Sequence, residues 1–161
     1  FSYLKKTTAM YNGLLHLHNL MRWVVLNFAL ITIIRSLSGL SGRKPFAAGD
    51  KRAGMLYMIS IDIQALIGIL LYITQKWYNV LMSGGAMKNP AARFFSMEHF
   101  LGMLIALILV HIGYSATKKN IPDGTKFKRL FWYSLLSLII ILAMIPWPFR
   151  EFIGRPWFPG R

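Results

Sequence analysis

The chain has 161 residues, of which 55% are hydrophobic and 15% are charged, and its mean hydropathy is positive. This composition is typical of a membrane protein and unlike that of an average soluble domain. The 19 Lys and Arg residues far outnumber the 5 Asp and Glu residues, but they lie almost entirely between apolar blocks. That pattern favours contact with a lipid bilayer over binding of nucleic acid.

The sequence contains no cysteine, which excludes disulfides, iron–sulfur clusters, thiolate metal sites and covalent c-type heme attachment. The opening FSYLKKTTAMYNG has no apolar run that ends at a small-residue cleavage site, so it does not predict a secretory signal. There is also no P-loop, nucleotide-binding glycine fingerprint, H-E-x-x-H or EF-hand motif. Nothing in the sequence therefore points to a catalytic activity of its own.

Four segments are long and apolar enough to cross about 30 Å of hydrocarbon, which takes about 20 residues of α-helix. We place them at 14–35, 54–75, 97–117 and 129–147. Because short loops favour antiparallel neighbours, the sequence predicts a single all-α domain over 1–161, an integral membrane up-down four-helix bundle. The Pro- and aromatic-rich tail at 148–161 is predicted to be non-helical.

Basic residues concentrate in the two loops that follow the first and third segments. These residues are Arg43, Lys44, Lys51 and Arg52, then Lys118, Lys119, Lys126, Lys128 and Arg129. Compact basic loops favour the cytoplasmic side, so both termini are expected outside.

A short list of polar residues lies within the apolar segments. It comprises His16, His18 and Arg22 on the first segment, Asp62 and Gln64 on the second, and Glu98, His99 and His111 on the third. A charge near the bilayer centre costs at least about 2.5–3.5 kcal/mol unless it is compensated, so such residues are functional candidates.

The first group is predicted to lie near the outer leaflet. The first and third segments run in the same direction, so His18 and His99 fall at similar depth. His16 is rotated about 200° from His18, whereas Arg22 lies one turn further along the same face as His18. This favours His18 as the inward histidine and predicts that Arg22 pairs with Glu98 or with an anionic cofactor group.

The second group is predicted nearer the opposite surface. His111 lies about 18 Å along the helix from His99, and Asp62 lies about two turns into an antiparallel segment. Asp62 and His111 are therefore expected at similar depth, where they could pair.

These positions permit a b-type cytochrome. Two histidines on different membrane helices can clamp a heme iron, and a bundle core is a usual cofactor site. Arg22 is suited to the propionates because a guanidinium binds carboxylates in a fork. Gly102 and Gly113 would leave room for a flat macrocycle.

The histidine-bearing segments also resemble those of small four-helix bacterial membrane proteins described as cytochrome b-like. The matching stretches are LHNLMRW at 17–23, MEHFLGM at 97–103 and HIGYS at 111–115, and the likeness continues to IPWP at the end of the fourth segment. The resemblance implies one heme b held by His18 and His99, with Arg22 and Glu98 as supporting groups. It also implies electron transfer in a bacterial inner membrane, as a carrier or a subunit of a respiratory complex.

Two other interpretations remain open. In the first, the chain is a cofactor-free accessory subunit: the histidines lie at headgroup level, Arg22 extends to the surface, and the tail lies over a neighbouring subunit. Trp23, Trp77, Trp132 and Trp147 are then interface anchors. In the second, the chain binds a quinone or forms a proton or ion path through Asp62, Gln64, Glu98, His99 and His111.

Overall fold

The computed structural model describes residues 2–158, with side chains from residue 10 onward, and every regular element in this range is a helix. The long helices are α1 (Ser2–Leu37), α2 (Ala48–Thr74), α5 (His99–Ala116) and α6 (Asp123–Met144). Between α2 and α5 lie α3 (Trp77–Met82), the 3₁₀ turn η1 (Gly85–Lys88), α4 (Pro90–Arg93) and the π-helical turn η2 (Phe94–Glu98). The predicted all-α class is confirmed.

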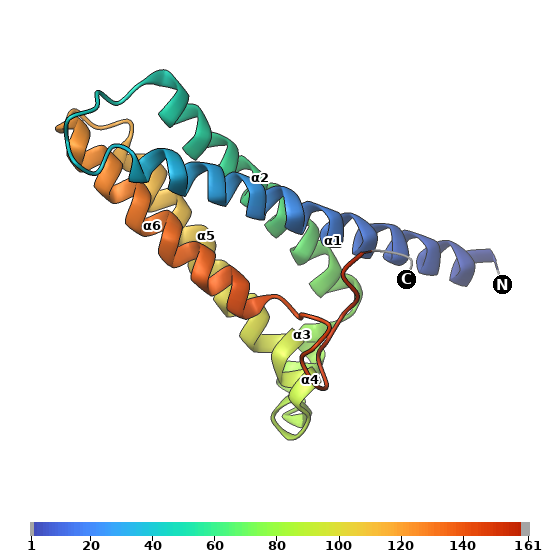
Figure 1. Cartoon of the computed structure of the whole chain (residues 1–161). Helices are drawn as coiled ribbons and strands as arrows, with labels where there is room; N and C mark the ends of the chain where they lie inside the picture. The colour runs from blue at the N-terminus through green and yellow to red at the C-terminus, as the bar shows by residue number, and fades with distance from the viewer. Residues whose placement is uncertain (1, 159–161) are drawn as a thin grey trace.

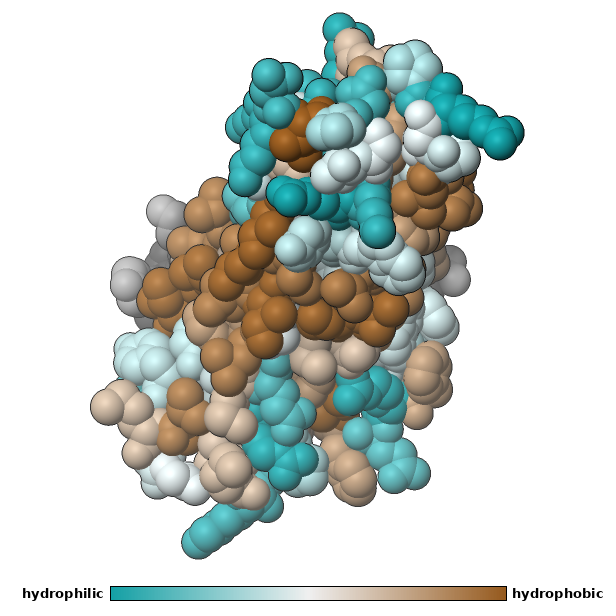
Figure 2. Space-filling model, turned by 90° about the vertical axis from the view of Figure 1, so that its left-hand side faces the viewer, coloured by the Kyte–Doolittle hydropathy of each residue, from teal (hydrophilic) through white to brown (hydrophobic). Residues whose placement is uncertain are grey.

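The four long helices are membrane-spanning in length and composition. The stretches Met10–Leu37, Ala48–Thr74, Pro90–Ala116 and Asp123–Met144 are each long and apolar enough to cross a bilayer. Figure 2 shows apolar side chains gathered across the middle of one face, with hydrophilic side chains above and below them. The chain is therefore an integral membrane protein, and its exposed apolar surface contacts lipid.

The helices form an up-down bundle in which α1 packs on α2 and α6, and α5 packs on α6 and α2. Figure 1 shows two antiparallel hairpins, α1 with α2 and α5 with α6, that spread apart toward the end where the chain termini lie. Two consecutive hydrogen bonds connect three helices within the bundle. The Tyr57 hydroxyl of α2 lies 2.9 Å from Ser137 Oγ of α6, which donates to the Ala106 carbonyl of α5 at 3.1 Å. Such interhelical bonds are a usual means of joining membrane helices.

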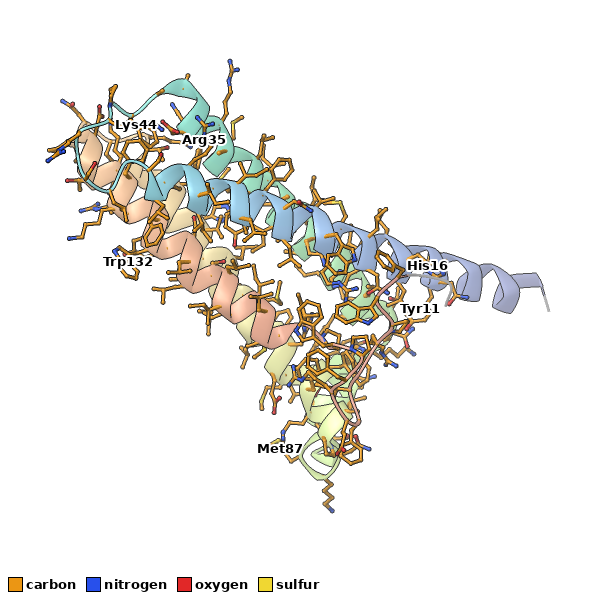
Figure 3. The ribbon with its side chains drawn as sticks, in the orientation of Figure 1. Tyr11, His16, Arg35, Lys44, Met87 and Trp132 are labelled. Atoms are coloured by element: carbon orange, nitrogen blue, oxygen red, sulfur yellow. The ribbon has the colours of Figure 1, made fainter. Side chains whose placement is uncertain are left out.

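At the end that carries the basic loops, ion pairs close the first hairpin and the second hairpin packs against it. Asp50 is buried there, and its Oδ1 accepts from Arg35 Nε at 3.1 Å and from Lys44 Nζ at 3.3 Å. Figure 3 labels both cations at this end. The Phe127 ring fills the space beside Gly39, where a Cβ would lie 2.3 Å from the ring. Asp50 is not among the candidate residues identified from the sequence, and it holds a loop rather than a membrane-embedded site.

The predicted fourth segment runs three residues too far, because α6 ends at Met144 rather than at 147. Two prolines explain this end. The helical partners of the Leu142 and Met144 carbonyls would be the N–H groups of residues 146 and 148, and both of those residues are proline. Beyond this point the chain is non-helical through residue 158, as predicted, and residues 159–161 of the predicted tail lie outside the described range.

Candidate functional site

His18 on α1 and His99 at the start of α5 face each other near the wide end of the bundle. Their ring centroids lie 6.3 Å apart and their planes are inclined by 66°. The predicted juxtaposition of these two histidines is confirmed. It follows from helix geometry alone, since two parallel helices bring equivalent depths together.

A π-helical turn immediately precedes His99. In η2 the chain takes an extra residue per turn, which frees backbone carbonyls from the regular helical pattern. One of them, the Ser96 carbonyl, accepts a hydrogen bond from the Tyr72 hydroxyl of α2 at 2.9 Å. The Phe94 ring of the same turn lies 5.6 Å from the His99 ring, centroid to centroid. The turn therefore sets where α5 begins, and its Phe94 ring packs against His99.

The His99 ring is oriented by the end of α6. Its Nδ1 lies 2.8 Å from the Met144 carbonyl oxygen, the carbonyl that Pro148 leaves without a helical partner. Because a carbonyl oxygen only accepts, Nδ1 carries the proton and donates, which leaves the lone pair on Nε2. This is the arrangement found in metal-binding histidines, whose second ring nitrogen usually donates to a carboxylate or a backbone carbonyl.

The His18 ring packs closely against α2. A Cβ on Gly68 would lie 3.2 Å from His18 Cε1, so the ring uses the space that this glycine leaves. Gln64 Nε2 donates to the His18 backbone carbonyl at 3.0 Å. Within the described residues, His18 Nδ1 and Gln64 Oε1 are buried and have no hydrogen-bond partner. The site thus contains a buried ring nitrogen whose hydrogen-bonding capacity is unsatisfied among the described residues.

Both histidines line a cavity of about 240 Å³ whose walls are mostly apolar. Other residues that line it include Tyr11, Arg22, Gly68, Tyr72, Met103 and Arg155. Figure 3 labels Tyr11 on the part of α1 near which the C-terminal tail passes. An apolar cavity with a few convergent polar groups is the usual form of a ligand or cofactor site.

Arg22 does not pair with Glu98, so that one of the two predicted partners is wrong, while pairing with an anionic cofactor group stays a prediction. Its Nη2 donates to the Trp157 carbonyl at 2.7 Å, and its Nε has no partner among the described residues. Glu98 instead accepts from Arg93 Nε at 2.6 Å. The π-helical turn places Glu98 beside Arg93, and the backbone of the returning tail reaches Arg22.

The C-terminal tail lies on this chain's own bundle. Trp157 and Phe158 both stack on Trp23 of α1, with ring centroids 6.3 and 5.7 Å from that indole. The Arg155 guanidinium lies over the Phe95 ring at 5.0 Å. Figure 1 shows the tail running from the end of α6 back to α1. The described part of the tail therefore packs on this chain, and its contact with a neighbouring subunit stays a prediction.

Gly102 and Gly113 do not make room for a macrocycle. A Cβ on Gly102 would lie 2.5 Å from Met144 Cγ, and one on Gly113 would lie 2.9 Å from Tyr133 Cβ. Both glycines let α5 approach α6 closely, which is a usual role of small residues between membrane helices.

The second predicted pair is confirmed, since His111 Nε2 lies 3.4 Å from Asp62 Oδ1. Neither of these residues lines the cavity, and His16 is exposed and also stands outside it. The five residues of the predicted proton or ion path do not form one connected set in the described structure, because Gln64 contacts the His18 backbone and Glu98 contacts Arg93.

Searches of protein-family models, of curated proteins and of solved structures find no match to this chain. Among the described residues, no group of three or more His, Asp or Glu side chains is placed to hold a metal ion. A heme has a different requirement, since the porphyrin supplies the equatorial ligands and the protein needs only axial ones.

Proposed function

We propose that this protein binds one heme b between His18 and His99 and carries electrons within the membrane. The observation that carries the proposal is the 6.3 Å separation of the two ring centroids at an apolar cavity. An imidazole nitrogen binds a metal at about 2 Å and the ring centre lies about 1 Å beyond it, so two axial histidines place their ring centres about 6 Å apart. The observed separation fits this requirement.

The hydrogen-bonding state of the His99 ring also supports the proposal. The Met144 carbonyl holds His99 in the tautomer whose Nε2 is free to bind a metal. The His18 ring lacks such an acceptor, because its buried Nδ1 has no hydrogen-bond partner among the described residues. Arg22 and Arg155 line the same cavity and would supply cations for the heme propionates.

When bound, the heme would supply one-electron redox chemistry, and the chain would hold and orient it. The mostly apolar walls would exclude water, which influences the reduction potential of a buried heme. Electron donors and acceptors would be a quinone or other subunits of a respiratory complex. We further propose a bacterial inner membrane with the two basic loops in the cytoplasm and the termini outside, following the charge asymmetry of the loops.

The direct experiment is an absorbance spectrum of the full chain, purified in mild detergent from cells supplied with heme. The dithionite-reduced minus oxidised difference should show b-type bands. A preparation that is folded and lacks these bands contradicts heme binding.

One observation favours a second candidate, a cofactor-free accessory subunit. Arg22, the cation assigned to the propionates, already donates to the Trp157 carbonyl, so the tail satisfies part of its hydrogen-bonding capacity. Under this alternative the purified chain has no heme bands and co-purifies with other membrane subunits.

A further inference from the structure

Asp62 on α2 and His111 on α5 form a pair that faces out of the bundle. The side chain of Asp62 is 37% exposed and that of His111 is 43% exposed. Apolar residues surround the pair on the same two helices, and Ile59, Leu66, Leu104 and Ile108 are all exposed. This surface, which we call the α2–α5 face, therefore presents an acid and a base within an otherwise apolar area.

The pair lies at hydrocarbon depth. At a rise of about 1.5 Å per residue, Asp62 lies about 15 Å along α2 from Arg52, and His111 lies about 10 Å along α5 from Lys118. The two helices are each apolar over the intervening turns. Lipid would therefore meet two ionisable side chains that membrane proteins usually keep covered.

His111 has an acceptor oxygen beside each of its ring nitrogens. Its Nδ1 lies 3.0 Å from the Leu107 carbonyl oxygen, and its Nε2 lies 3.4 Å from the Asp62 carboxylate, which is within ion-pair distance. The α2–α5 face thus presents one acid and one base at the same depth.

We infer that the α2–α5 face binds a second copy of this chain across a twofold axis along the membrane normal. Two copies in one membrane share their orientation, so such an axis keeps every residue at its own depth. Asp62 and His111 are at the same depth, and the axis would bring the acid of each copy toward the base of the other. A face with both charges is self-complementary in this way, whereas a face with one sign of charge would repel its copy.

The inference does not rest on the heme proposal, although Leu104 of the α2–α5 face also lines the cavity. His111 is about 18 Å along α5 from His99, and neither Asp62 nor His111 lines the cavity. Dimerisation is therefore expected with or without heme.

Cysteine cross-linking provides the test, because the sequence contains no cysteine. Ile59→Cys and Ile108→Cys place a thiol on the α2–α5 face, at residues that are 42% and 47% exposed. Leu136→Cys and Ile139→Cys on α6 are the matched controls, at 47% and 54% exposure. Each variant of the full chain is treated in native membranes with a short bifunctional maleimide, and the products are identified by mass spectrometry.

The face variants should give a cross-linked homodimer in several-fold higher yield than the α6 variants. Equal yields would overturn the inference, and so would a product in which the partner is a different protein.

A charge exchange tests the complementarity itself in the Ile108→Cys background. Asp62→His alone and His111→Asp alone each leave like groups at one depth, and each should lower the homodimer yield several-fold. The double exchange, Asp62→His with His111→Asp, should restore the yield. Thermal unfolding in detergent confirms that the three variants are folded, and a folded double variant that does not recover the dimer would overturn the role of the charges.

Discussion

His99 Nδ1 lies 2.8 Å from the carbonyl oxygen of Met144, so the last residue of α6 orients the first residue of α5. The carbonyl is available because Pro148 has no N–H group with which to continue the helix. The IPWP sequence at 145–148 thereby ends α6 and leaves free the Met144 carbonyl, which sets the His99 tautomer.

Replacing the two prolines tests this relationship. The double variant Pro146→Ala with Pro148→Ala lets α6 continue, and the restored N–H of residue 148 competes for the Met144 carbonyl and so weakens the support of the His99 ring. Loss of such a supporting hydrogen bond typically costs about 10–100-fold in metal affinity, and we expect a heme-affinity loss at the lower end of that range. Heme titration of the purified apoprotein measures the change. Pro45→Ala, in the loop at the opposite end of the bundle, should leave the affinity unchanged, and equal affinities for both variants would contradict this role.

Gly68 provides a test on the opposite wall. A Cβ there would lie 3.2 Å from His18 Cε1, and the branched side chain of Gly68→Val would displace the ring from its position opposite His99. We expect heme bands reduced several-fold at equal protein concentration. Gly13→Ala is the control, because nothing lies within 4 Å of a Cβ at that glycine. Normal bands in Gly68→Val would show that the packing of His18 against α2 is not required.

The pairing of His18 with His99 and of Asp62 with His111 could be predicted from the sequence, whereas the hydrogen-bond partners around these pairs could not. Depth and helical phase are fixed by a regular rise and rotation per residue, so they place His18 near His99 and Asp62 near His111. The acceptors of the His99 ring and of Arg22 are backbone carbonyls, and because every residue has one, the sequence does not indicate which carbonyl is used. The turn at Phe94–Glu98 also departs from regular helix, so it moved Glu98 away from the partner that helical phase had suggested. The sequence does contain one signal for the Met144 carbonyl, since Pro146 and Pro148 mark where the helical hydrogen bonds stop.

The tail should be released when its aromatic contacts are removed. Trp157→Ala deletes the stacking on Trp23 while keeping the backbone carbonyl that Arg22 binds. We expect faster trypsin cleavage after Arg150 in the detergent-solubilised protein, followed by mass spectrometry. Trp132→Ala is the control, since Trp132 is also a half-exposed tryptophan but lies on α6 away from the tail (Figure 3). Identical cleavage rates would mean that the stacking does not hold the tail.

Asp50 is expected to contribute to stability without affecting heme binding. Asp50→Ala removes the acceptor of Arg35 and Lys44 and the cap that binds the Ala47 N–H at 3.1 Å. Because both cations are partly exposed, we expect a loss of about 1–3 kcal/mol. Denaturant unfolding in detergent measures it, and Asp50→Asn, which keeps an oxygen for the backbone N–H, should lose less. An unchanged unfolding midpoint, or a loss of heme bands at full folding, would contradict this assignment.

The reduced-minus-oxidised spectrum of three matched histidine variants tests the central claim most directly. His18→Ala and His99→Ala each remove one proposed axial ligand, whereas His16→Ala removes an exposed histidine from the same helix as His18. We predict that the b-type bands disappear in the first two variants and persist in the third, with all three folded by thermal unfolding. Bands that persist without His18 or His99, or that disappear without His16, would contradict ligation of the heme by His18 and His99.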